Sequence, residues 1–136
     1  MKTPHPPHQS PKAFTLLETT IVIMVLLALI NIGFFASRKM DEWKFGRSAS
    51  ETLRMVYSAQ RMYLADNPTV SVANLTSELL LPYMTGNPTV MPTVTSLVKT
   101  ELPIIVNVSP PVINAGSGVA YDPSGSNSDS LWDVGE

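Results

Sequence analysis

The chain has 136 residues, enough for one small domain and an extended element, and its formal net charge of −2 gives no reason to expect a nucleic-acid partner. It contains no cysteine, which excludes disulfides, thiolate metal sites, thiol catalysis and cysteine-linked lipid anchors. Hydrophobic residues make up 44% of the chain and charged residues only 15%, and the apolar excess lies in one segment near the N-terminus, which predicts contact with a membrane.

Residues 1–13 combine four prolines with two lysines and hold no apolar cluster that could fold. They are typical of a leader or a tail.

From Phe14 the composition changes abruptly. Between Thr19 and Ser37 no residue is charged, and as a helix this stretch would rise about 28 Å, close to the hydrocarbon thickness of a bilayer. A buried core helix is the alternative, but a helix that is apolar all round needs a larger domain around it than this chain supplies. We therefore predict a membrane-spanning helix.

Residues 38–65 continue without a proline, and Gly46 is their one glycine. Apolar side chains recur at helical spacing on one face, and charged or polar side chains recur on another. The apolar set is Ala49, Leu53, Val56, Tyr57, Tyr63 and Leu64, and the polar set is Arg47, Glu51, Arg54, Ser58 and Arg61. Pro68 clashes with a continuing turn and restricts the residue before it, so the helix is expected to end near Asp66. One helix thus runs from about residue 15 to residue 66, apolar in its first half and amphipathic in its second.

Residues 67–136 favour a small acidic α+β head. A short helix is predicted at residues 74–81, ended by Pro82, and four apolar or alternating runs predict strands at residues 90–94, 104–108, 118–121 and 131–134. Lys99 is the only base in this region, against the acidic residues Glu78, Glu101, Asp122, Asp129, Asp133 and Glu136. The fold class is therefore α+β: a long N-terminal transmembrane and amphipathic helix, with a head of a short helix and antiparallel strands packed on its amphipathic face. The head has no histidine, scattered acids and no glycine-rich phosphate loop, so we expect no enzyme activity.

One carboxylate, Glu18, stands at the threshold of the otherwise uncharged helix. An unpaired acid costs about 2–3 kcal/mol at the centre of a membrane helix and less near the interface. Glu18 therefore either lies in the headgroup region, where the cost is small, or has a partner. No base within the helix supplies that partner.

Residues 12–18, with the sequence KAFTLLE, resemble the N-terminal signature of the type IV pilin-like family, which includes the pseudopilins. That signature is a short basic leader, a small residue, and Phe-Thr-Leu-x-Glu opening a long hydrophobic helix. It is matched in order by Ala13, Phe14, Thr15, Leu16 and Glu18. The resemblance covers about residues 12–66, because heads in this family vary widely.

The resemblance implies that a prepilin peptidase cuts between Ala13 and Phe14 and N-methylates Phe14. The charged α-amine of Phe14 would then pair with Glu18 in its own or a neighbouring subunit and set the register of assembly. The implied parts are a cleaved leader (1–13), a transmembrane half (14–37), an amphipathic half (38–66) and a head (67–136). The implied partners are the peptidase, other pilin or pseudopilin subunits, the inner-membrane assembly platform and the lipid bilayer. The chain would cross the inner membrane once, with its N-terminus cytoplasmic and its head periplasmic, before entering a periplasmic or surface filament.

Three departures favour a pseudopilin or minor pilin over a major adhesive pilin. Ala13 stands where the family usually has glycine, no proline kinks the chain between Phe14 and Asp66, and no disulfide can close the head. The positive-inside rule opposes the implied topology, because only Lys2 and Lys12 precede the span, whereas Arg38, Lys39, Lys44 and Arg47 follow it. We follow the motif, since the leader has to meet a peptidase on the cytoplasmic side.

The bases after the span alternate with acids in a mixed-charge collar, which could pair between subunits, face solvent or contact lipid headgroups. Its members are Arg38, Lys39, Asp41, Glu42, Lys44 and Arg47.

A secretory signal peptide fits poorly, because Phe34 and Phe35 occupy the position where signal peptidase requires a small residue. A signal-anchored membrane protein with a small periplasmic domain and no filament role is the remaining alternative, and it leaves Glu18 without a role.

The C-terminal loop offers oxygen ligands on a Gly/Ser-rich segment, which suits calcium. The candidate ligands are Asp122, Asp129 and Asp133. The alternative is a solvated hairpin turn between residues 118–121 and 131–134. No other metal or cofactor is expected.

Overall fold

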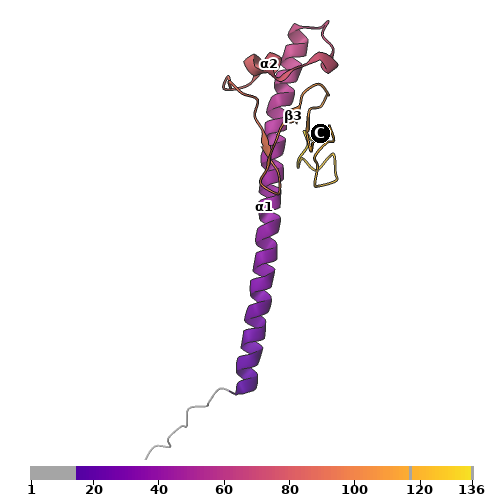
Figure 1. The fold of residues 1–136 in the computed structure, drawn as a ribbon. Coiled ribbons are helices and arrows are strands. Elements are labelled where there is room, and N and C mark those ends of the chain that lie inside the picture. The colour runs from indigo at the N-terminus through magenta and orange to yellow at the C-terminus, as the bar shows by residue number, and fades with distance from the viewer. Residues whose placement is uncertain (1–14, 117, 136) are drawn as a thin grey trace, which may run out of the picture. The chain divides into compact units, whose positions relative to one another are not determined.

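A computed structural model describes residues 15–116 and 118–135 (Figure 1). Helix α1 (Leu16–Asp66) is followed by short helical turns and short strands. Contacts divide the chain after Arg38. The first unit contains the apolar part of α1, residues 16–37, which we call the apolar segment. We call the second, from Lys39 onward, the folded unit. The fold is α+β, as predicted: one long N-terminal helix and a C-terminal region with small antiparallel strands.

Helix α1 has 51 residues and ends at Asp66, as the position of Pro68 predicts. Its last turn is closed by Asn67, whose main-chain N–H donates to the Tyr63 carbonyl at 2.9 Å and whose side-chain amide donates to the same oxygen at 3.0 Å. These two bonds satisfy a carbonyl that would otherwise lack a partner at the helix end.

The predicted helix at residues 74–81 is three separate turns. They are the 3₁₀ turn η1 (Val72–Asn74), helix α2 (Ser77–Leu80) and the 3₁₀ turn η2 (Leu81–Tyr83). Pro82 lies in the first turn of η2, where its missing N–H costs no hydrogen bond. The prediction that Pro82 ends a helix was therefore wrong in detail, because the proline lies within the next turn.

The strands are shorter than predicted, and most lie elsewhere. β1 (Val94–Thr95) pairs antiparallel with β2 (Glu101–Leu102), and β3 (Ile104–Ile105) pairs antiparallel with β4 (Val112–Ile113), in two separate two-stranded sheets. Of residues 90–94 only the last is in a strand, and of residues 104–108 only the first two. Residues 118–121 provide a single isolated bridge, from Ala120 to Asn114.

The predicted strand at residues 131–134 does not form. Ser130 and Trp132 have φ of 59° and 66°, in the left-handed region that no strand residue adopts. The segment instead curls so that the Trp132 side chain, 4% exposed, enters the core. Pro92 explains part of the loss at residues 90–94, since proline cannot donate to a strand ladder.

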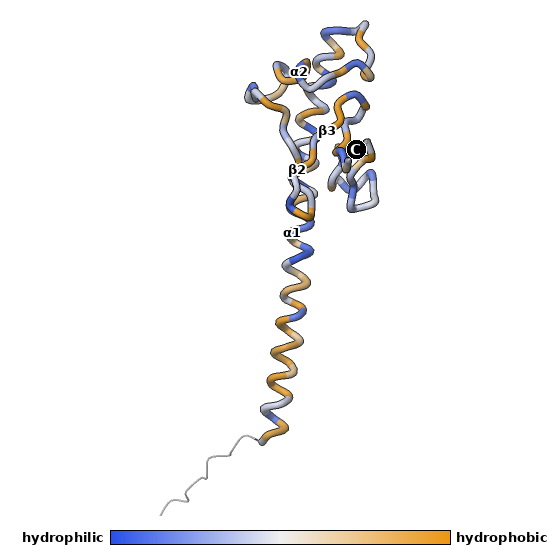
Figure 2. The backbone as a smooth tube through the Cα atoms, viewed as in Figure 1, coloured by the Kyte–Doolittle hydropathy of each residue, from blue (hydrophilic) through white to orange (hydrophobic). Residues whose placement is uncertain are grey.

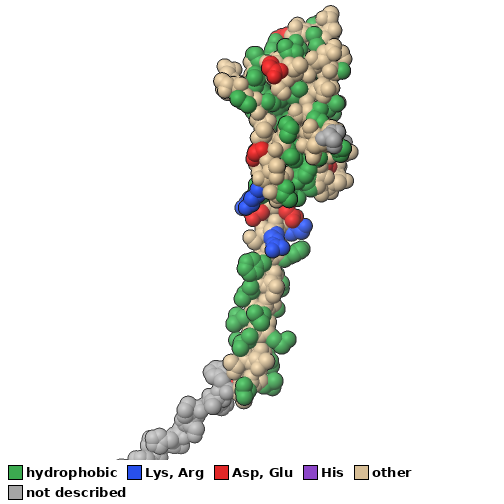
Figure 3. All heavy atoms as spheres, in the orientation of Figure 1, with side chains coloured by type: hydrophobic (Ala, Val, Ile, Leu, Met, Phe, Trp, Pro, Cys, Tyr) green, Lys and Arg blue, Asp and Glu red, His purple; other side chains and the backbone are tan. Residues whose placement is uncertain are grey.

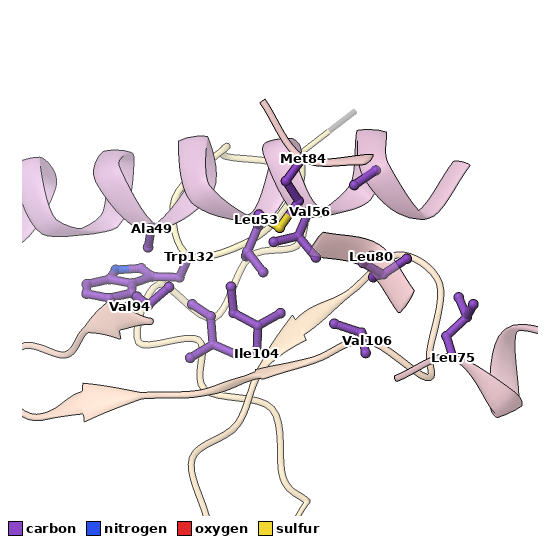
Figure 4. Packing of buried hydrophobic residues seen from close by; sticks show 12 residues of the cluster. Ala49, Leu53, Val56, Leu75, Leu80, Met84, Val94, Ile104, Val106 and Trp132 are labelled. Carbon is purple, nitrogen blue, oxygen red and sulfur yellow. The ribbon is translucent and has the colours of Figure 1, made fainter. Parts of the chain in front are cut away.

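The core of the folded unit lies between the amphipathic half of α1 and the irregular segments after it (Figure 4). Helix α1 contributes one stripe of buried residues at helical spacing: Gly46, Ala49, Ser50, Leu53, Val56, Ala59 and Gln60. The segments after α1 contribute the other side of the core, which is made by Leu75, Leu80, Met84, Val94, Ile104, Val106, Ile113 and Trp132. The predicted amphipathic face is confirmed at Ala49, Leu53 and Val56, which are fully covered, whereas Tyr57 is only half-buried.

Three polar side chains of α1 bind main-chain carbonyls of these segments. The Ser50 hydroxyl donates to the Ser130 carbonyl at 2.7 Å, and Arg54 Nε donates to the Val134 carbonyl at 2.8 Å. Gln60 Nε2 donates to the carbonyls of residues 106 and 108, at 3.0 and 2.8 Å. Arg54, which the sequence places on the polar face of the helix, thus holds the C-terminal segment through its guanidinium.

Gly46 allows the closest approach between α1 and the C-terminal segment. A Cβ atom at this position would lie 2.8 Å from the Trp132 indole nitrogen, and the Trp132 main-chain N–H donates to the Gly46 carbonyl at 3.1 Å. Only glycine leaves room for the indole at this distance from the helix backbone.

We therefore expect Gly46→Ala to destabilise the folded unit by about 1–2 kcal/mol, because overpacking costs more than the helix propensity that alanine restores. Denaturant unfolding followed by tryptophan fluorescence measures the change. Gly33→Ala is the matched control, since nothing lies within 4 Å of a Cβ there. A Gly46→Ala protein as stable as the parent would contradict the close-packing argument.

Candidate functional site

The first turn of α1 holds the predicted assembly residue Glu18. The Glu18 main-chain N–H donates to Thr15 Oγ1 at 3.2 Å, which makes Thr15 the N-cap of the helix. The predicted processing residues Ala13 and Phe14, like the rest of the leader, lie outside the described residues. The pair between the Phe14 amine and the Glu18 carboxylate therefore stays a prediction.

The cap gives Glu18 a local role that we did not foresee from the sequence. Thr15 and Glu18 have the Thr-x-x-Glu spacing of a capping box, a pattern that could have been recognised before the structure. A carboxylate in the first turn also interacts favourably with the positive end of the helix dipole, typically by about 0.3–1 kcal/mol. Glu18 is thus tolerated at a helix start even without a charged partner.

The apolar segment is exposed along its whole length, and among the described residues α1 is the one helix long and apolar enough to cross a membrane (Figure 2). Three of its polar side chains donate to main-chain carbonyls one turn earlier. Thr19 Oγ1 donates to the Thr15 carbonyl at 3.0 Å, Thr20 Oγ1 to the Leu16 carbonyl at 2.7 Å, and Asn31 Nδ2 to the Leu27 carbonyl at 2.7 Å. Such internal bonds are what a polar group needs where no water is available.

Five of the six collar residues form ion pairs along α1, and Figure 3 shows acidic and basic side chains close together on the helix below the head. Lys39 Nζ lies 2.8 Å from Glu42 Oε2, and Lys44 Nζ lies 3.8 Å from Asp41 Oδ1. Arg47 Nε lies 3.5 Å from Glu51 Oε1. All three pairs join residues three or four positions apart and are largely exposed. Each therefore adds less than about 1 kcal/mol to the stability of the fold, as is usual for exposed ion pairs. Their acids and bases remain available to a charged surface.

The calcium candidates are mostly engaged in turns. Asp122 Oδ1 accepts hydrogen bonds from the Ser124 main-chain N–H at 3.0 Å and from its hydroxyl at 2.6 Å. Asp129 Oδ1 accepts one from the Leu131 N–H at 2.9 Å. Within the described part of the chain, no three His, Cys, Asp or Glu side chains gather closely enough to hold a metal ion. The calcium hypothesis stays a prediction.

Asp133 differs from the other two acids. Both of its carboxylate oxygens are shielded from solvent and find no hydrogen-bond partner of good geometry among the described groups. Burial raises the pKa of Asp133, the negative charges of Asp129 and Asp122 raise it further, and the Gly135 main-chain N–H and the Arg54 charge lower it less. The residue lines a mainly apolar hollow of about 330 Å³, together with Tyr121 and Trp132.

Comparison with protein-family models, with curated proteins and with solved structures finds no match for this chain. The resemblance to type IV pilins therefore rests on residues 12–66 and their pattern alone.

Because the pKa of Asp133 is raised on folding, its contribution to stability is present at acid pH and is lost as the pH rises through the raised value. Asp133→Asn should therefore be more stable than the parent at neutral pH, and the difference should vanish below the ordinary aspartate pKa. Asp129→Asn, which removes one repelling charge, should shift stability in the same direction by less. Unfolding measured across this pH range, with calcium and with a chelator, provides the check.

A bound calcium ion would reverse this result, because the ion would stabilise the parent and be lost from Asp133→Asn. A melting curve unchanged by chelation removes the calcium hypothesis. A parent protein more stable than Asp133→Asn at neutral pH in chelator would contradict the raised pKa.

Proposed function

We propose that this chain is a structural subunit, a pseudopilin or minor pilin, of a type IV pilus-like or type II secretion filament. Processing by a prepilin peptidase between Ala13 and Phe14 precedes assembly from the inner membrane. The chain crosses that membrane once, with the head in the periplasm, and then enters a periplasmic or surface filament. Its partners are the peptidase, other subunits and the assembly platform.

One observation carries the proposal: Glu18 is the only ionisable side chain in the apolar segment, and it lies in the first turn of α1 directly after the Ala13–Phe14 motif. Cleavage there would create an ammonium group four residues from the carboxylate. In a low-dielectric surrounding these two charges attract strongly, and leaving one of them unpaired is costly. The pair would therefore favour one axial offset between subunits.

The apolar segment supports the same proposal. Thr19, Thr20 and Asn31 donate to carbonyls of the same chain segment, so these three side chains can leave lipid and pack against other helices with their donors already paired. The segment would span the membrane before assembly and form the filament core afterwards.

A second candidate is a signal-anchored membrane protein with a small periplasmic domain. It is favoured by the Thr15 cap, which gives Glu18 a place at the helix start without any filament. The two candidates differ in what the carboxylate does, since a cap needs only the Glu18 main-chain N–H and a register pair needs the side chain.

Replacing the Glu18 side chain separates the candidates. Glu18→Val should leave membrane insertion intact and lower incorporation into the filament by about tenfold or more, because the Phe14 ammonium would lose its partner. Incorporation is measured by sheared-filament fractions and subunit crosslinking in cells with an active peptidase. Thr19→Val is the matched control, since it removes a polar group from the same turn without removing a charge. Normal incorporation of Glu18→Val would rule out the register mechanism.

Mass spectrometry of the N-terminus tests the processing step separately. We expect a chain that begins at Phe14 and carries one added methyl group. Isolation of the protein from peptidase-active cells with residues 1–13 still attached would refute the pilin-like assignment and favour the signal-anchored alternative.

A further inference from the structure

The turn between β1 and β2 presents an apolar side chain to the outside of the folded unit. The turn is closed by hydrogen bonds between Ser96 and Lys99 and between Ser96 and Thr100, and Lys99 takes a left-handed φ of 60°. Val98 at its tip is 80% exposed, more than the exposed loop valine Val90, at 74%. A valine in this position contributes nothing to the core.

The turn is fixed in place beside α1. The Leu97 N–H donates to the Tyr121 hydroxyl at 3.1 Å, and the Tyr121 ring packs edge-on against Trp132 with 5.3 Å between ring centroids. Trp132 in turn is bonded to the helix at Gly46. The β1–β2 turn therefore has a defined position on the helix rather than a free one.

That position brings the turn to the part of α1 nearest in sequence to the apolar segment. Leu97 lines a groove of about 260 Å³ together with Lys39 and Trp43 of α1. The Trp43 side chain remains 53% exposed, although it continues the stripe that is buried from Gly46 onward. We call Lys39, Trp43, Leu97, Val98 and Lys99 the interfacial patch.

The chemistry of the patch is that of a membrane interface. Tryptophan is enriched at the level of lipid headgroups, and lysine side chains place their charge there while their stems cover apolar surface. Lys99 is the one base among residues 67–135, so the rest of the head is acidic and would be repelled by anionic lipids. The interfacial patch combines exposed apolar groups with positive charge.

Chain connectivity keeps Trp43 close to the end of the predicted span. Trp43 follows Ser37, the end of the predicted span, by six positions, or about 9 Å at helical rise. The interfacial layer on each side of the hydrocarbon core is about 5–8 Å thick. Helix side chains generally tilt toward the N-terminus, a tendency that would bring the Trp43 indole nearer to that layer.

We propose that the interfacial patch docks the folded unit on the headgroup layer of the membrane that the apolar segment crosses. Val98 enters the boundary of the acyl chains, Trp43 lies at headgroup level, and Lys39 and Lys99 contact anionic headgroups. This inference rests on the membrane insertion in the proposed function, and it does not depend on filament assembly.

Site-specific labelling tests it directly, because the chain has no cysteine of its own. Val98→Cys and Val90→Cys, a matched pair of exposed valines, are labelled with an environment-sensitive fluorophore in the full chain. Leu27→Cys reports on the apolar segment. The proteins are reconstituted in phosphatidylethanolamine–phosphatidylglycerol vesicles or in phosphatidylcholine vesicles, with nitroxide quenchers at the headgroup or deep in the acyl chains.

We expect quenching by the headgroup nitroxide at position 98 to exceed that at position 90 by about twofold or more, as expected for an interfacial group. Adding Lys99→Glu should lower it in the anionic vesicles and change it little in phosphatidylcholine. Two results would overturn the docking and leave the membrane span intact. One is equal headgroup-nitroxide quenching at positions 98 and 90, and the other is no quenching at position 98 while the deep nitroxide quenches position 27. No deep quenching at position 27 would overturn the span itself and the docking with it.

Discussion

The buried face of α1 between Gly46 and Gln60 is the constraint on which the folded unit depends. The segments after α1 form only two-residue strands, so they cannot satisfy their own main-chain groups or close a core by themselves. Helix α1 supplies both missing parts. Its small and apolar residues provide the packing surface, and Ser50, Arg54 and Gln60 donate to the carbonyls that a longer sheet would have paired. Any change in the helix face is therefore transmitted to loops far along the chain.

The first half of α1 has different surroundings. There, no protein segment covers the side chains, and polar groups such as Thr20 and Asn31 bond to carbonyls one turn earlier. In the second half, Ser50, Arg54 and Gln60 bind carbonyls of other segments as well. The collar lies between the two halves. Its short-range ion pairs neither pair the main-chain carbonyls of α1 nor bind other segments. Helix geometry is continuous through both halves, and only the surroundings differ.

Helix α1 could be predicted almost to the residue, because hydrophobic periodicity, the absence of proline and the Asn67–Pro68 stop agree over 51 residues. The strands could not, since two-residue strands carry too little alternation to be seen. Apolar runs such as residues 131–134 are buried through left-handed turns that no periodicity reveals. For the candidate site, the charge of Glu18 and the motif at residues 13–18 both identified Glu18, and the Thr15 cap could be predicted from the Thr-x-x-Glu spacing of the same residues. The anchoring roles of Arg54 and Gln60 could not be predicted from the sequence, because they depend on carbonyls contributed by distant loops.

Docking on lipid and assembly into a filament make opposite demands on the head. A subunit that leaves the bilayer has to break every contact with lipid, so those contacts cannot be strong. Val98, Trp43 and the two lysines of the patch contribute about 1–2 kcal/mol each at most. That is enough to hold one orientation of the head against thermal motion, and far less than the transfer free energy of the apolar segment. Under the proposed function, the interfacial patch would thus orient the folded unit on the membrane before assembly and release it when the subunit enters the filament.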